Sequence, residues 1–479
     1  MRQDKNKNLL ATTLFVASGS CLEYYNYSLF IYLIPIWGKE LFAPGSDQNF
    51  KGFGIICLTS LIRPIAASLI GKIGDKAGRR YALFVCAGLM STACLAMSYL
   101  PRYDNYNFLT KYNLLTLTII LCRLFQIASV SGKLNGSAIF LIEHLPNKAG
   151  LISGFMWSIT VIGMLIAALV EYACSISMNP NSWRLPIRIG GIVGFIGFIA
   201  IKYLSEGKEY VESKNNKNQE KFLSAKDKTF ANLTIACVGS AIGGIFYYSI
   251  TYIPQLHKGI NLSDIALNRV NLLLIYCLSV LLGGLLSHKL QHKKSNTVWI
   301  YLVALVIVIL TVSSSPLYLN SKVKNSSNIL VLALALSCIG LLKLKSTTGG
   351  MAEVRRIMTW GAVGTLLLAY FGLTEVIHHN SLFIHSCMLV FMGLYVGPSH
   401  QLMSSIFPIS MRYSSISLYY GIGTAFFGGS STFVCMYMAK IHRLLPVVFI
   451  FTCASLALAS IYLSKKVRFA RGKIEDNAG

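Results

Sequence analysis

A series of long apolar segments constrains the fold of this chain more than any other feature. The first series covers residues 9–36, 52–70, 81–100, 114–142, 149–173 and 185–204, and the second covers 231–254, 267–287, 297–317, 328–342, 357–377, 382–406, 413–438 and 445–464. A helix needs about 20 apolar residues to cross a bilayer. The chain is 54% hydrophobic and 13% charged, and soluble domains carry about twice that charge. The sequence therefore predicts an all-α polytopic membrane protein with fourteen spans that contact lipid.

The segment 328–342 is the weakest of the fourteen, because it is short and is followed by the basic sequence KLK. If it does not cross, the neighbouring 297–317 does not cross either, and the count becomes twelve. The first segment runs from Leu9 to about Ile36, which is too long for the apolar region of a cleavable signal peptide. We expect it to remain as a membrane anchor.

Basic side chains lie mostly in alternate loops. With the N-terminus inside, the inside loops and tails hold 28 Lys and Arg residues, whereas the outside loops hold ten. Since Lys and Arg favour cytoplasmic loops, both termini are predicted to be cytoplasmic, with 318–327 outside and 343–356 inside. The Lys-, Asn- and Ile-rich composition favours a bacterial inner membrane. Charge spread over alternate loops, rather than gathered in one stripe, argues against a nucleic-acid partner.

A polar, charged stretch at 205–228 separates the two series. It predicts an N-terminal half at 1–204, a cytoplasmic linker at 205–230 and a C-terminal half at 231–479 that holds an extra hairpin at 297–345. Two helical halves that meet at a central path are typical of secondary transporters. The sequence has no Walker motif, nucleophile elbow or metal-ligand spacing, so we predict neither an enzyme nor a cofactor or metal site.

The ten residues GKIGDKAGRR at 71–80 join the second and third apolar segments. Glycines let helices approach closely and permit a tight turn. A carboxylate here can accept hydrogen bonds from a helix N-terminus or an arginine, and so latch the inside end when it is closed. The arginines are expected to hold the loop inside, and the alternative is a basic loop that only sets topology. The stretch resembles the signature loop of the major facilitator superfamily, G-x-x-x-D-[RK]-x-G-R-[RK], with matches at Gly71, Asp75, Lys76, Gly78, Arg79 and Arg80.

Further stretches resemble the metabolite:H⁺ symporter family of that superfamily, and within it the proline/betaine transporter branch. They are GSCLEYYNYSLFIY (19–32), LIRPIAASLIGKIGDKAGRR (61–80), QIASVSGKLNGSAIFLIEHLP (126–146), SWRLPIRIGG (182–191) and IFPISMRYSSISLYYGIG (406–423). The resemblance implies a major facilitator fold of two six-helix halves. It also implies a monomer that transports a small polar organic solute, such as proline, betaine or an organic acid, by proton-coupled symport and alternating access.

Ionisable residues inside apolar segments are costly and usually functional. The candidates for binding solute or proton are Glu23, Asn26 and Tyr27 on one face of the first segment, Arg63 in the second, and Gln126 and Lys133 in the fourth. A carboxylate between two cations would suit a cavity that binds a solute carboxylate. One alternative is that Glu23 only pairs with a basic residue to hold helices together. Arg123 is a candidate for an intramembrane charge pair, and its alternative is to extend to the outer interface.

Two positions depart from the resembled family. Its Asp in the first segment is Asn26 here, and its Glu in the fourth is Lys133, which changes the groups that can carry protons and favours a more anionic solute. The second-half copy of the loop, GGLLSHKLQHKK at 283–294, has His288 in place of the family's Asp. These departures motivate a second hypothesis, a non-transporting membrane solute sensor derived from the same family.

Overall fold

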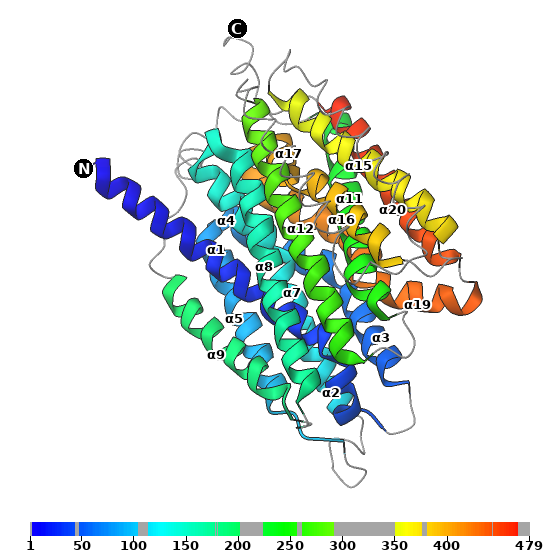
Figure 1. Ribbon diagram of the computed structural model, residues 1–479. Coiled ribbons are helices and arrows are strands. Elements are labelled where there is room, and N and C mark those ends of the chain that lie inside the picture. The colour runs from blue at the N-terminus through cyan, green and yellow to red at the C-terminus, as the bar shows by residue number, and fades with distance from the viewer. Residues whose placement is uncertain are drawn as a thin grey trace.

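The structure is a computed structural model, and it describes residues 2–43, 47–103, 114–177, 179, 181–201, 224–255, 261–291, 350–375, 381–442 and 444–467. All the regular elements in these ranges are helices. They run side by side as one bundle (Figure 1). The prediction of an all-α protein is therefore confirmed for the described residues.

The first series of apolar segments forms six helical units. These are α1 (Arg2–Tyr32) with α2 (Ile34–Leu41), α3 (Gln48–Ser60) with α4 (Arg63–Lys76), α5 (Arg79–Ser98), α7 (Leu114–His144), α8 (Ala149–Ile176) and α9 (Arg184–Ala200). The short η1 (Pro146–Lys148) precedes α8. Proline has no N–H to donate, so it is tolerated in the first turn of a helix and breaks a longer one. Pro35 and Pro64 accordingly begin new helices, and α3 and α4 meet at a bend of 44°.

The second series forms six further units. They are α11 (Ala225–Tyr247) with η4 (Tyr248–Tyr252) and η5 (Ile253–Gln255), α12 (Leu262–Gln291), α15 (Met351–Glu375), α16 (Ser381–Val396) with α17 (Ser399–Ile406), α18 (Ile409–Thr424) with η9 (Ala425–Gly429) and α19 (Ser431–Ile441), and α20 (Leu445–Lys466). By length and hydropathy, six of the described helices could each cross a membrane, or seven if the bent α3–α4 pair counts as one span. Twelve of the fourteen predicted segments thus coincide with helices. The other two, 297–317 and 328–342, lie outside the described residues, as does most of the predicted linker.

The bundle has two ends, which we call the loop end, where residues 76–80 lie, and the opposite end. A small apolar cluster joins Val16, Leu83, Ile142 and Ile152 near the loop end, so α1 begins there. The ammonium of Lys466 lies 5.4 Å from the ring centre of Phe230. The start of α11 and the end of α20 therefore lie at the same end of the bundle. In Figure 1 α1 begins at the upper left and the red end of α20 lies near the top. Their predicted cytoplasmic side stays a prediction.

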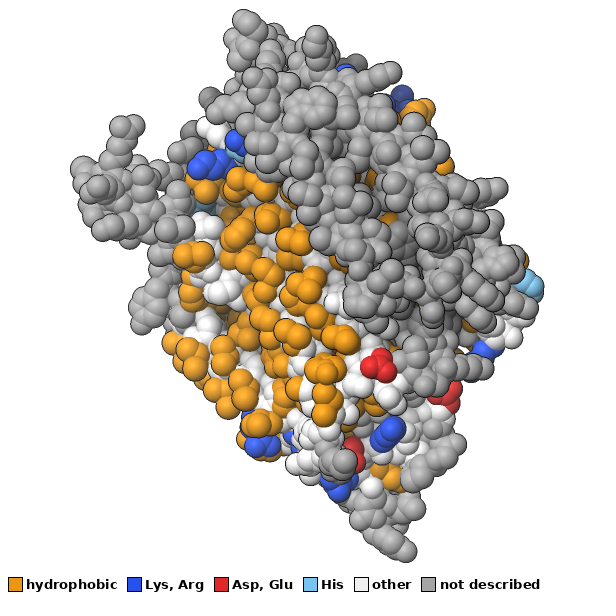
Figure 2. Space-filling view, in the orientation of Figure 1, with side chains coloured by type: hydrophobic (Ala, Val, Ile, Leu, Met, Phe, Trp, Pro, Cys, Tyr) orange, Lys and Arg blue, Asp and Glu red, His pale blue; other side chains and the backbone are white. Residues whose placement is uncertain are grey.

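The two series meet along α8 and α12 and along α4 and α18. Gly154 and Gly284 allow the first contact, because a Cβ atom on Gly154 would lie 2.7 Å from the Cα atom of Gly284. Small residues are what let membrane helices approach this closely. The outer surface carries exposed apolar side chains such as Ile189 and Ile196 of α9. Figure 2 shows an apolar face with Lys and Arg side chains near its upper and lower margins, as expected of a lipid-facing surface.

Candidate functional site

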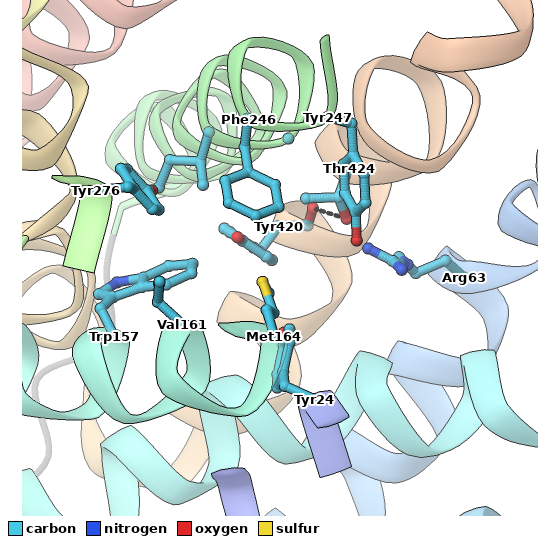
Figure 3. A pocket seen from close by; sticks show the side chains of 12 residues that line it. Tyr24, Arg63, Trp157, Val161, Met164, Phe246, Tyr247, Tyr276, Tyr420 and Thr424 are labelled. Carbon is cyan, nitrogen blue, oxygen red and sulfur yellow. Dashed lines mark hydrogen bonds between the residues drawn. The ribbon is translucent and has the colours of Figure 1, made fainter. Parts of the chain in front are cut away.

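A cavity lies between the two series of helices (Figure 3). Its lining comes from both series: Tyr24 of α1, Arg63 of α4, Trp157, Val161 and Met164 of α8, Ile242, Gly243, Phe246 and Tyr247 of α11, Tyr276 of α12, and Tyr420 and Thr424 of α18. Its volume is about 40 Å³. One ordered water needs roughly 10–15 Å³ of such space, so the cavity has room for only a few waters in this state.

Arg63 supplies the charge in this lining. It is the first residue of α4, just after the bend from α3, and it is buried. Its Nη2 atom donates a hydrogen bond of 2.9 Å to the hydroxyl oxygen of Tyr27. In Figure 3 its guanidinium points toward the hydroxyl end of Tyr247. Aromatic rings and one guanidinium thus surround a small space, in which a carboxylate would bind strongly to the arginine.

Arg123 of α7 lies behind Tyr27 and is fully buried. Its guanidinium carbon is 4.2 Å from the ring centre of Tyr27 and 4.9 Å from that of Phe30. Its Nη1 atom donates to Oε1 of Gln126 at 2.9 Å. Arg123 therefore does not extend to the outer interface, and none of the described carboxylates forms an ion pair with it.

Glu23 and Lys133 form a buried ion pair in which Oε2 and Nζ are 3.1 Å apart. The hydroxyl of Ser129 also donates a hydrogen bond to Glu23. Neither charged residue lines the cavity. Of the three charged residues expected to share one site, Arg63 lines this cavity, whereas Glu23 and Lys133 pair with each other. Their joint role in binding stays a prediction.

Asn26 faces a different neighbour, although it lies close to Glu23 on the helical wheel. Its amide nitrogen donates to the carbonyl oxygen of Gly190 in α9 at 3.2 Å. Gln126, besides its bond to Arg123, places its amide nitrogen 3.5 Å from the sulfur of Cys94. The predicted binding face of the first segment is therefore divided among several neighbouring helices.

At the loop end, Asp75 holds α18. Its Oδ2 atom accepts from the backbone N–H of Ser414 at 2.8 Å, and its Oδ1 atom accepts from that of Tyr413 at 3.3 Å. Nη1 of Arg79 lies 2.9 Å from Oδ1. The structure thus shows both kinds of partner that the sequence suggested for this carboxylate, the first turns of another helix and an arginine.

Arg79 of the same loop is fully buried. Its Nη2 atom donates to Oε1 of Glu143 at 3.2 Å and to the carbonyl oxygen of Ile409 at 2.8 Å. Arg412 joins the same carboxylate at 3.3 Å. Lys76 and Arg80 are exposed, which fits the expected basic loop.

Two glycines of the loop have the geometry expected of them. A Cβ atom on Gly71 would lie 2.6 Å from the Cα atom of Ser414, so α4 and α18 are in backbone contact there. Gly78 has a φ of 113°, a value that residues with a Cβ atom rarely adopt. Contacts between the two series therefore close the bundle at the loop end.

The opposite end is also held by contacts between the series. Glu171 of α8 and Arg269 of α12 form a buried ion pair, and Nε of Arg269 donates to the carbonyl oxygen of Ile250 at 3.1 Å. The rings of Phe50 and Phe433 have centres 4.7 Å apart. Contacts thus join the two series at both ends of the bundle, on either side of the cavity.

Sequence reasoning missed the aromatic lining and the ion pair at the opposite end. Tyr24 and Tyr420 stood in stretches quoted for the family resemblance, but aromatic residues are common in apolar segments and carry little signal alone. Trp157 and Tyr247 had no signal beyond their type. Glu171 was an ionisable residue near the end of a predicted span and could have been found by the rule that singled out Glu23.

Comparison with known proteins decides the family. The sequence model of the Major Facilitator Superfamily matches residues 16–352. The chain belongs to the major facilitator superfamily. The relatives found by sequence are named as transporters, and the solved structures found by fold are named as symporters or transporters.

Curated relatives of this major facilitator are named for proline and betaine. It is 22% identical over 304 residues to a putative proline/betaine transporter of Staphylococcus aureus strain COL, covering 60% of this chain and 64% of the relative. It is 24% identical over 262 residues to the proline/betaine transporter of Escherichia coli K12, covering 50% of each. The chain thus matches about half to two thirds of the length of these relatives. The predicted resemblance to this branch is confirmed.

Solved structures confirm the major facilitator fold. A proton:xylose symporter bound to 6-bromo-6-deoxy-D-glucose superposes with a TM-score of 0.69 at 13% identity, covering 98% of both chains. An inward-open xylose transporter from E. coli superposes with a TM-score of 0.60 at 14% identity, covering 97% of this chain and 98% of the other. At these identities the likeness shows the fold alone.

Proposed function

We propose that this chain is a secondary active transporter that carries a small polar organic solute with a carboxylate group, such as proline, betaine or an organic acid. Arg63 is the observation that carries the proposal. It is a buried guanidinium in the lining of the cavity between the two series of helices, and none of the described carboxylates pairs with it. A charge left unpaired in a membrane interior costs several kcal/mol, so a solute carboxylate is the natural partner.

Alternating access is the proposed mechanism. Asp75 and Arg79 hold α18 at the loop end, and the Glu171–Arg269 pair joins α8 to α12 at the opposite end. Releasing one set of contacts while the other stays closed would open the cavity to one side at a time. The predicted N-terminal half at 1–204 and C-terminal half at 231–479 would be the two moving bodies. We expect a monomer in a bacterial inner membrane with both termini cytoplasmic.

Proton coupling is proposed to use Glu23. A carboxylate that pairs with Lys133 at 3.1 Å can exchange that partner for a proton when the surrounding helices move. The names of the relatives support a solute of the proline and betaine kind, and the family resemblance supports symport with protons.

Uptake into proteoliposomes tests the function. A labelled panel of proline, betaine, monocarboxylates and dicarboxylates is offered with and without an inward pH gradient, to wild type and to the Arg63→Gln variant. We expect uptake of at least one carboxylate-bearing solute, stimulation by the gradient, and a loss of about tenfold or more in Arg63→Gln, the amount of one charge-assisted contact. Binding of a solute without any flux would overturn transport in favour of the sensor hypothesis.

A further inference from the structure

The buried cations of this protein fall into two groups. In the described part of the chain, six Lys and Arg side chains are buried: Arg63, Arg79, Arg123, Lys133, Arg269 and Arg412. Four of them pair with a carboxylate, since Arg79 and Arg412 share Glu143, Arg269 meets Glu171 and Lys133 meets Glu23. Arg63 and Arg123 are the two without such a partner among the described residues. The fold therefore neutralises its other buried cations and leaves these two charged.

Arg63 and Arg123 are neighbours through one side chain. The Tyr27 hydroxyl accepts a hydrogen bond from Arg63, while the Tyr27 ring lies 4.2 Å from the guanidinium carbon of Arg123. The Nε atom of Arg63 and the Nε and Nη2 atoms of Arg123 are buried without a hydrogen-bond partner. Buried N–H groups without a hydrogen-bond partner are rare in folded proteins, because burying a donor without a hydrogen bond is costly. Three free donors beside the cavity point to an acceptor that the protein itself does not supply.

We propose that Arg63 and Arg123 together form a two-carboxylate site, and that the transported solute is a dicarboxylate whose two charges balance both guanidinium groups. The inference rests on the proposed function and names its substrate class. Each guanidinium has a planar set of donors that matches a carboxylate. One carboxylate binds Arg63 in the cavity, and the second reaches Arg123 when the Tyr27 side chain turns aside.

Side chains must move before an organic solute can bind. The present cavity of about 40 Å³ has room for only a few waters, so any organic solute must displace lining side chains. Tyr27 contacts both arginines, so turning its side chain would let a solute held by Arg63 reach Arg123. The competing explanation is structural: Arg123 between the rings of Tyr27 and Phe30 gains cation–π stabilisation, which would need no solute.

An isosteric pair of ligands separates these explanations. Succinate and its monoamide, succinamate, have nearly the same shape and differ by one negative charge. Binding of each to the purified full-length protein is measured by calorimetry, and uptake of each is measured in proteoliposomes. We expect wild type to bind succinate about tenfold or more tightly than succinamate, the difference that one charged contact makes.

In the Arg123→Gln variant, the ratio of the succinamate Kd to the succinate Kd should fall to about one. The Kd of succinamate itself should change by less than about twofold. Arg63→Gln should weaken both ligands. Arg188→Gln is the matched control, because Arg188 also stacks on a tyrosine, 4.5 Å from the ring centre of Tyr99, but on α9 away from the cavity. It should change neither ligand.

Three results would each overturn the two-carboxylate site. The first is a wild-type protein that binds succinate and succinamate equally tightly. The others are an Arg123→Gln variant that still binds succinate more tightly, and one that loses affinity for both ligands equally. If Arg123→Gln does not fold, Arg123→Lys is measured instead. We expect it to bind succinate over succinamate by a smaller ratio than wild type, and an unchanged ratio would contradict the proposal. Uptake of proline or succinamate without any preference for succinate would defeat this inference alone. Absence of flux for all solutes would instead defeat the proposed function.

Discussion

At the scale of single residues, the Glu23–Lys133 pair shows how this protein balances charge inside its helical bundle. Both side chains are buried, and the pair is neutral as a unit. A buried ion pair adds little stability compared with apolar side chains, but removing one partner leaves an uncompensated charge that costs about 3–5 kcal/mol. The two residues are therefore coupled, whatever else each one does.

This coupling predicts a pattern in a double-mutant cycle. Glu23→Gln and Lys133→Met should each lower thermal stability in detergent, whereas the double variant should recover most of the loss, because it leaves no unpaired charge. The melting temperatures of the four proteins measure the cycle. Additive losses in the double variant would contradict the pair.

Proton coupling through Glu23 has its own test. In Glu23→Gln, the residual uptake should no longer respond to a pH gradient, because the amide cannot exchange Lys133 for a proton. Uptake at equal and unequal pH, compared with wild type, measures it. If uptake by this variant still responded to the pH gradient, a group other than Glu23 would carry the proton.

At the scale of elements, contact between α4 and α18 depends on one carboxylate. Asp75 accepts two backbone N–H groups of α18 and meets Arg79, and hydrogen bonds to a charged group contribute about 1.5–3 kcal/mol each. Asp75→Asn should therefore weaken closure of the loop end and cut uptake by about tenfold at normal expression. Lys76→Gln, an exposed neighbour on the same helix, is the control and should transport normally. Normal uptake by a stably expressed Asp75→Asn protein would rule out the latch.

The packing of α8 on α12 gives a second prediction at this scale. A Cβ atom on Gly154 would meet the backbone of Gly284 at 2.7 Å, whereas one on Gly197 would meet nothing within 4 Å. Gly154→Ala should thus lower stability, with overpacking costing about 1–3 kcal/mol, and should slow transport. Gly197→Ala should be neutral. Equal melting temperatures of the two variants would show that α8 and α12 are not in backbone contact.

At the scale of the whole molecule, the arrangement of ends predicts membrane sidedness. Gly350 precedes α15, which begins at Met351, and lies on the side of the bundle where the sequence predicts the cytoplasm, while exposed Lys51 belongs to α3 near the opposite end. In a cysteine-depleted background, Lys51→Cys should react with a membrane-impermeant reagent added outside the cells, and Gly350→Cys should react only after permeabilisation. Reaction at position 350 from outside would show that 328–342 does not cross as predicted.

The sequence by itself determined the class of this protein, its helical units and the loop that joins α4 to α5. Those features depend on local properties: the length of an apolar segment, and a glycine that permits a tight turn. Gly78 could be interpreted from its immediate neighbours, whereas the bend at Pro64 inside 52–70 was not predicted. The family resemblance followed from the order of such local stretches.

Only the tertiary structure decided which charges meet. Glu23 could have faced Arg63 as well as Lys133 by any argument from helical spacing, and Arg79 could have been solvated. Partners in a helical bundle come from helices far apart in the sequence, and the rotation of each helix is set by packing with all its neighbours at once. For that reason the pairing of Glu23, the burial of Arg79 and the unbalanced charge of Arg63 and Arg123 could be known only once the helices were placed.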